Sequence, residues 1–98
     1  MEQLKIYLKK RRLKKLIKYY FNNIDISAKT QTTINVQAKA FYCYFYKKID
    51  NKIKNKDLAK KVNRNYATIS KYLNNINYFK WGKYNDIFIN ISNKLKLK

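Results

Sequence analysis

Histidine and proline are absent from this chain of 98 residues, and glycine and cysteine each occur once. Carboxylates are scarce and scattered, at Glu2, Asp25, Asp50, Asp57 and Asp86. A zinc site needs about four Cys, His or carboxylate ligands, and metal-dependent nucleases need clustered carboxylates. With Gly82 alone, no glycine-rich phosphate loop can be built. We therefore expect no enzyme: no catalytic residues, no metal site, no cofactor and no small-molecule substrate.

Cys43 has no second cysteine with which to pair, which fits a reducing compartment. We interpret it as a small buried apolar residue in preference to a reactive thiol. No apolar stretch has the length of a signal-peptide core or of a membrane span of ~18 residues. A cytoplasmic protein, in a bacterium or its host, is the expectation.

The charge of the chain is strongly one-sided, with 24 Lys and Arg against 5 Asp and Glu and a net charge of +19. Such an excess repels itself in the compact state, which indicates a polyanionic partner: nucleic acid first, an anionic membrane surface second. At 46% hydrophobic residues, with ten Tyr and five Phe, the chain is too apolar for a disordered basic tail. Its length allows one compact domain.

Between Ile6 and Ile24 the apolar residues recur at helical spacing, and the opposite face is basic. The pattern predicts a basic amphipathic helix within residues 1–26. Three interpretations of its basic face stay open: a solvated face of an ordinary packed helix, a phosphate-contacting helix, or a membrane-surface helix.

Residues 34–49 and the C-terminal stretch give different periods. The run FYCYFY at 41–46 alone is typical of a buried strand, but apolar residues from Ile34 to Ile49 follow a helical period over a length too great for most strands, so we predict a helix. Farther on, Ile87, Ile89 and Ile91 alternate with other residues as in a strand. Residues 78–81 could pair with it across a turn at Gly82, which predicts a β-hairpin.

Between these segments, two short helices are predicted, from Asn55 to about Val62 and from Asn65 to about Asn75. Ala59 is small where the two helices would cross, Asn63 tolerates a left-handed turn, and Asn65 is a good N-cap. A buried seam can form from Leu58, Val62, Ile69, Leu73 and Ile76. Residues 58–73 (LAKKVNRNYATISKYL) thereby resemble the helix-turn-helix of bacterial and phage regulators.

With the aromatic helix before it and the hairpin after it, the stretch 34–92 resembles a winged helix-turn-helix domain. The resemblance implies a mainly α fold with a small β-hairpin, in which a winged domain at 27–98 follows the basic helix at 1–26 in one folding unit. One departure is Arg64, which stands where the family usually has a buried Val or Ile. Either its stem packs and its head reaches a phosphate, or the turn differs from the usual one.

The resemblance also implies that the helix from Asn65 enters the major groove of DNA, where base edges can be read. The candidate base-reading residues are Asn65, Tyr66, Ala67, Ser70, Lys71 and Asn74. For Tyr66 a place at the edge of the core is an equal alternative, because the helical wheel puts it next to the apolar stripe.

Contacts to the DNA backbone are expected from three places in the chain. They are Lys60, Lys61, Arg64 and Thr68 around the turn, Lys80, Lys83 and Tyr84 near the tip of the wing, and Arg11, Arg12, Lys14, Lys15 and Lys18 on the first helix. A solvated hairpin tip is the alternative for the wing.

The function expected on these grounds is sequence-specific binding of double-stranded DNA by a transcriptional regulator. The abundance of Lys, Asn, Ile and Tyr, whose codons are AT-rich, indicates a low-GC genome, a phage or a plasmid. A homodimer on a two-fold site is expected, because one short helix contacts few base pairs. The alternatives are a replication or partition factor, a membrane-surface binder, and an inhibitor that binds another protein through a winged fold.

Overall fold

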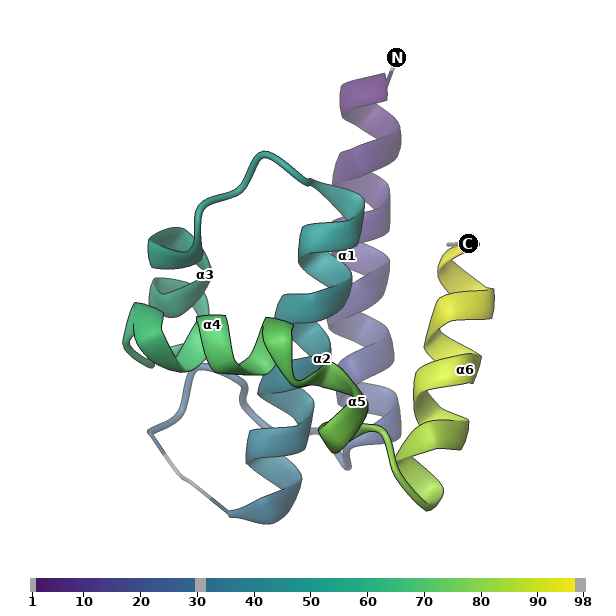
Figure 1. Ribbon diagram of the computed structural model, residues 1–98. Helices are drawn as coiled ribbons and strands as arrows, with labels where there is room; N and C mark the ends of the chain where they lie inside the picture. Colours follow the sequence, from purple (N-terminus) through teal and green to yellow (C-terminus); the bar gives the residue numbers. More distant parts are fainter. Residues whose placement is uncertain (1, 30–31, 97–98) are drawn as a thin grey trace.

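The computed structural model describes residues 2–29 and 32–96, and within them the chain forms six α-helices (Figure 1). The helices are α1 (Glu2–Tyr20), α2 (Thr33–Ile49), α3 (Asn55–Val62), α4 (Tyr66–Asn74), α5 (Ile76–Phe79) and α6 (Lys83–Leu95). The predicted helices at the N-terminus, at 34–49 and on both sides of Asn63 are all present, with ends shifted by a few residues.

Helix α2 lies in the middle of the fold and is enclosed by its neighbours. It packs against α1 and α6 on one side and against α4 and α5 on the other (Figure 1). Phe41 and Phe45 fill the centre, where Phe41 meets Phe21, directly after α1, and Phe88 of α6 edge to face. The aromatic run that suggested a strand is therefore the hydrophobic core of a helical protein.

The side of α2 that carries Lys39 and Cys43, opposite the residues that set its helical period, is buried as well. The helical period did not predict this burial. Cys43 is fully buried, and Lys39 is only 1% exposed. The Lys39 ammonium donates a hydrogen bond to the Ala28 carbonyl, and burial lowers the pKa of Lys39 below its ordinary value. In this chain with few carboxylates, the buried ammonium of Lys39 is thus hydrogen-bonded to a backbone carbonyl and not paired with a carboxylate.

Helix α1 is joined to this core by Leu13, Ile17 and Phe21, which are fully buried. After α1 the chain turns at Asn22 and Asn23, both with φ of 60°, a left-handed conformation that Asn tolerates better than most residues. Lys10, on the same helix, forms a 2.9 Å salt bridge with Asp50 at the end of α2. Residues far apart in sequence therefore belong to one core.

The predicted β-hairpin is wrong: the described residues contain no strand, so the fold is entirely helical there and has no wing. Residues 78–92 instead complete α5 and form most of α6. Tyr84, Ile91 and Leu95 are buried at helical spacing, whereas Ile89, which a strand would have placed with Ile87 and Ile91, is 46% exposed. The alternation of isoleucines was thus compatible with two periods, and packing against α1 and α2 selects the helix.

None of the helices in the part of the chain that the structure describes is both long and apolar enough to cross a bilayer.

Candidate nucleic-acid interface

Two short helices, α3 and α4, meet at a tight turn made by residues 63–65. Asn63 has φ 57° and ψ 50°, the left-handed conformation predicted for it, and the backbone N–H of Arg64 donates to the Ala59 carbonyl over 3.0 Å. Ala59 itself is 6% exposed. Its small side chain and the backbone of Asn63 together allow the chain to reverse closely behind α3.

The start of α4 is fixed by the side chain of Asn65. Asn65 has an extended backbone, and its Oδ1 accepts hydrogen bonds from the backbone N–H and the hydroxyl of Thr68, both over 2.9 Å. This is the N-cap that the sequence predicted, and it satisfies one of the orphan amides of the first turn. The remaining amides of that turn point out from the N-terminal end of α4, where the helix dipole favours an anion.

The inner faces of α3 and α4 hold the pair against α2. Leu58, Val62 and Ile69 are fully buried, Ile76 is 9% exposed, and Leu73 is half-buried. These are the residues of the predicted seam. Because the seam fixes the rotation of α4, it also fixes which side chains face solvent.

The candidate base-reading residues lie on the outer side of α4. Asn65, Tyr66, Ala67, Lys71 and Asn74 are exposed, and Ser70 is half-buried and accepts a hydrogen bond from Asn74 Nδ2 over 3.4 Å. Tyr66 is 66% exposed, so the structure places it in solvent at the first turn of α4 and not at the edge of the core. The outer face of α4 therefore carries amide, hydroxyl, phenol and ammonium groups side by side.

The four residues expected to contact the DNA backbone around the turn have different surroundings. Lys60 is exposed, whereas the ammonium of Lys61 lies 5.3 Å from the ring centroid of Tyr46 on α2. Arg64 is half-buried and its Nε is enclosed. Its stem therefore packs against the protein, as the first of the two alternatives for Arg64 predicted. The hydroxyl of Thr68 is engaged in the cap. Lys60 and Lys61 are therefore the exposed cations of this group, whereas Arg64 lies partly inside, near Tyr72 and Lys39.

The three wing residues need correction, because there is no hairpin to carry them. Lys80 follows α5 and its ammonium lies 4.6 Å from the ring centroid of Phe88, while Lys83 is exposed at the first turn of α6. Tyr84 is 8% exposed and stacks on Phe21 with ring centroids 6.2 Å apart. Tyr84 is a core residue and is not placed to contact a phosphate.

Helix α1 lies on the opposite side of α2 from α4 (Figure 1). Its expected phosphate-contacting residues, Arg11, Arg12, Lys14, Lys15 and Lys18, are all exposed. With α2 between them and packed helix axes ~8–10 Å apart, α1 and α4 are ~16–20 Å apart. The ammonium groups of Lys10 on α1 and Lys61 on α3 both lie close to the Tyr46 ring, at 4.9 and 5.3 Å from its centroid, so the basic side of α1 approaches α3 and not the outer face of α4.

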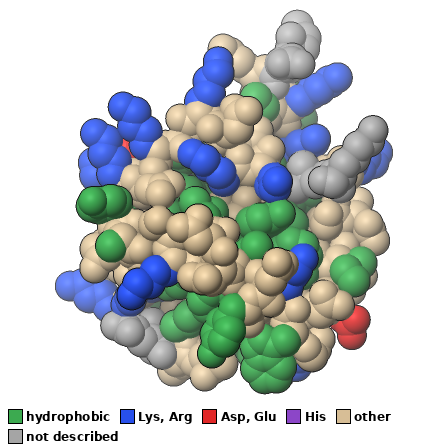
Figure 2. Space-filling model, in the orientation of Figure 1, with side chains coloured by type: hydrophobic (Ala, Val, Ile, Leu, Met, Phe, Trp, Pro, Cys, Tyr) green, Lys and Arg blue, Asp and Glu red, His purple; other side chains and the backbone are tan. Residues whose placement is uncertain are grey.

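Two exposed aromatic residues near the end of α4 were missed by the sequence interpretation. Tyr78 is 76% exposed and Trp81 is 59% exposed, on and just after α5. Figure 2 shows hydrophobic side chains gathered on this lower part of the front face. The sequence could have indicated this exposure, because a helical period through residues 76–79 turns only Ile76 and Phe79 inward. The exposure was missed because residues 78–81 were assigned to a strand.

Metal-ligating side chains do not cluster in the described part of the chain. No three His, Cys, Asp or Glu residues gather there as a metal site would need. Burial raises the pKa of the Cys43 thiol to about 12, so that it is protonated at neutral pH. The features that the surface does offer are cationic, amide and aromatic groups.

Comparison of the chain with protein-family models, with curated proteins and with solved structures finds no match. The likeness of residues 58–73 to a helix-turn-helix therefore depends on the residues and on the geometry of α3, the turn and α4.

Proposed function

We propose that this protein binds double-stranded DNA in a sequence-specific manner, with α4 as the recognition helix of a helix-turn-helix that has no wing. The observation that carries the proposal is the outer face of α4, where exposed polar and cationic side chains are presented by a helix whose rotation and N-terminus are both fixed. A transcriptional regulator is the simplest use of such a helix, because occupancy of a site is enough to block or recruit a polymerase.

The dimensions of α4 suit the major groove. With side chains an α-helix is ~10–12 Å across, which fits the ~12 Å width of the major groove of B-DNA, and the nine residues of α4 extend ~13 Å along the helix axis. Docked through its N-terminal half, α4 would present Tyr66, Ala67 and Ser70 to base edges, with Lys71 and Asn74 one turn farther along. Asn and Lys are side chains that form hydrogen bonds with adenine and guanine edges, respectively.

The charge of the chain supports a polyanionic ligand at this face. With a net charge of +19, the whole molecule attracts DNA, and Lys60, Arg64 and Lys71 lie on or beside the proposed reading surface. The α4 amides of the first turn add a favourable site for one phosphate oxygen. A homodimer on a two-fold site stays a prediction for this protein.

The experiment is selection of bound duplexes from a random DNA pool, followed by titration of the selected site and of random DNA. Lys71→Ala and Asn74→Ala should each lose ~1–3 kcal/mol on the selected site and little on random DNA, because a lost base contact removes discrimination. Lys52→Ala and Asn51→Ala, of the same residue types in the exposed α2–α3 loop, are the controls.

Enrichment of no sequence, or equal losses on both DNAs for the α4 variants, would show that α4 does not read DNA. Enrichment with losses confined to the α4 variants supports the assignment.

A further inference from the structure

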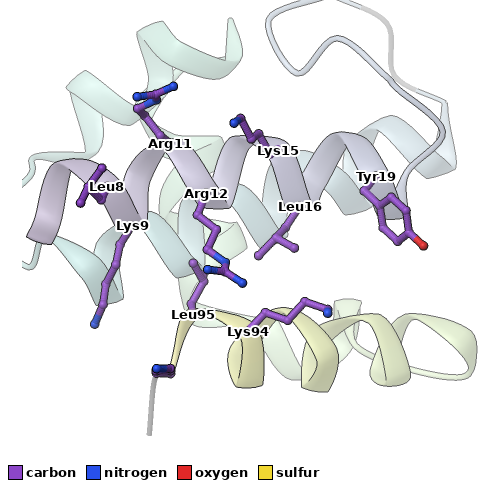
Figure 3. Close-up of a pocket in the computed structure, with 10 residues that line it drawn as sticks. Leu8, Lys9, Arg11, Arg12, Lys15, Leu16, Tyr19, Lys94 and Leu95 are labelled. Carbon is purple, nitrogen blue, oxygen red and sulfur yellow. The ribbon is translucent and has the colours of Figure 1, made fainter.

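A groove of about 850 Å³ runs between α1 and α6, away from the surface of α4 (Figure 3). Its floor is apolar, formed by Leu8, Leu16 and Tyr19 from α1 and Leu95 from α6. In Figure 3, Leu16 and Tyr19 project from α1 towards α6, and Leu95 projects back from α6. Leu8 is 50% exposed and Tyr19 is 76% exposed, so much of this floor is in contact with water.

The rim of the groove is basic along both helices. The cations that line it are Lys9, Arg11, Arg12, Lys15, Lys94 and Lys96, and among the described residues no carboxylate side chain lines it. The salt bridge found in the described residues joins Lys10 to Asp50 and uses none of these six. Of these, Arg12 of α1 and Lys94 of α6 lie between the two helices in Figure 3, where an anionic ligand would relieve the repulsion between them.

The apolar surface continues beyond the groove along the N-terminal half of α1. Leu4 is 54% exposed and lies one turn before Leu8, so the two side chains share a face of the helix. From Leu4 to Tyr19 the distance along α1 is ~22 Å at 1.5 Å per residue. A ligand that follows this line would need the length of a helix of four turns.

Possible ligands differ in how much of the apolar floor they would cover and how many cations of the rim they would neutralise. A nucleic-acid backbone would neutralise the cations but leave the leucines in contact with water. A second copy of this chain would add further positive charge to a surface that already lacks a carboxylate. A bilayer is flat on this scale and would not fill a concave groove between two helices.

We propose that the α1–α6 groove binds an acidic amphipathic helix of a partner protein. Leucine-like side chains on one face of that helix would lie on the floor, and carboxylates on its two flanks would pair with the cations of the rim. This is the helix-in-groove mode of recognition, in which apolar anchors recur at i, i+3 or i+4, and i+7. The inference does not depend on DNA binding by α4, because the two surfaces are on opposite sides of α2 (Figure 1).

The probe for the test is a fluorescein-labelled synthetic peptide of 18 residues, with leucines on one face of the helix and glutamates on both flanks. A peptide of identical composition with its leucines dispersed around the helix is the matched control for the apolar face. Anisotropy titrations with the full chain measure both affinities, and vesicles rich in phosphatidylserine are titrated in parallel.

The variant protein carries Arg12→Glu and Lys94→Glu, which reverse one charge on each side of the groove. Both residues line the groove, and in Figure 3 both lie between α1 and α6. The control variant carries Lys52→Glu and Lys56→Glu, which make the same change in net charge at exposed positions before and within α3. Thermal melts of both variants establish that each is folded.

We expect the peptide with its leucines on one face to bind at least about tenfold more tightly than the peptide with its leucines dispersed. The Arg12→Glu, Lys94→Glu variant should lose about tenfold or more of that affinity, and the Lys52→Glu, Lys56→Glu control much less. Equal binding of the two peptides would overturn the proposal, because attraction by net charge alone would then explain it. Equal losses in the two variants would overturn it as well. Binding of vesicles but of neither peptide would assign the groove to a membrane surface instead.

Discussion

Replacing Asn65 by two different residues separates its role in folding from its role in binding. Its Oδ1 accepts two hydrogen bonds from Thr68, and the loss of both in Asn65→Ala should cost ~0.5–2 kcal/mol of stability. For a domain of this size, each kcal/mol corresponds to ~4–8 °C in Tm. Asn65→Asp keeps an acceptor at the cap and adds a negative charge at the helix N-terminus, which is worth ~0.3–1 kcal/mol at an exposed site.

The effect on DNA should run in the opposite direction for the aspartate variant. Asn65→Asp removes the Nδ2 donor and places a carboxylate at the end of α4 that would approach phosphates and base edges. A loss of ~1–3 kcal/mol, or roughly 5- to 150-fold in affinity, is expected on the selected site. The aspartate variant should therefore melt at the same or a higher temperature than the native chain and yet bind DNA less tightly.

The control is Asn90→Asp, which makes the same change in net charge at an exposed position in the middle of α6. Thermal melts followed by circular dichroism and anisotropy titrations on labelled duplex give the two measurements. If Asn65→Asp binds the selected site as tightly as Asn90→Asp does, the N-terminus of α4 does not approach DNA and the reasoning fails.

Three further predictions concern other parts of the molecule. Ile69→Ala, at a fully buried position under α4, should lower the free energy of unfolding by ~2–5 kcal/mol in urea titrations, and a smaller loss would mean that the seam collapses around the gap. Lys60→Ala should reduce the slope of log affinity against log salt by up to ~1 on a short straight duplex, because an exposed cation next to the α3–α4 turn is lost. Lys14→Ala, on α1, should leave the slope unchanged, and equal reductions would show that α1 also contacts DNA. Cys43, with its pKa raised to about 12, should react with a thiol reagent at pH 8 only after unfolding in guanidinium, and rapid reaction of the folded chain would contradict its burial.

Local sequence signals predicted α3, the turn at residues 63–65 and the start of α4 because these signals act within the segment. Asn63 takes a left-handed backbone and Asn65 caps the next helix through contacts within four residues of the chain. The length of the apolar run from Ile34 to Ile49 likewise required a helix. In each case the physical cause lies within the segment itself, so it could be read without knowledge of its neighbours.

The wrong predictions concern segments whose secondary structure depends on contacts with residues distant in the sequence. Ile87, Ile89 and Ile91 fit a strand and a helix about equally, and the contacts of α6 with α1 and α2 make the choice. Because the strand was chosen, Tyr84 was predicted to contact DNA at a wing tip and Trp81 was assigned to a strand, so its exposure went unnoticed. The α1–α6 groove was beyond prediction for the same reason, since it exists only because residues 8–19 and 94–96 come together in the fold.

The enclosure of α2 has a consequence for how the protein opens and closes in solution. Its amides are covered by α1 and α6 on one side and by α4 and α5 on the other, so their hydrogen bonds can break only when neighbouring helices detach. The α2 amides should therefore exchange with solvent deuterium at the rate of global unfolding, while those of the N-terminal turns of α1, which pack on little, exchange through local fraying. A protein arranged in this way has a slowly exchanging central helix, while the ends of the outer helices can open without exposing it.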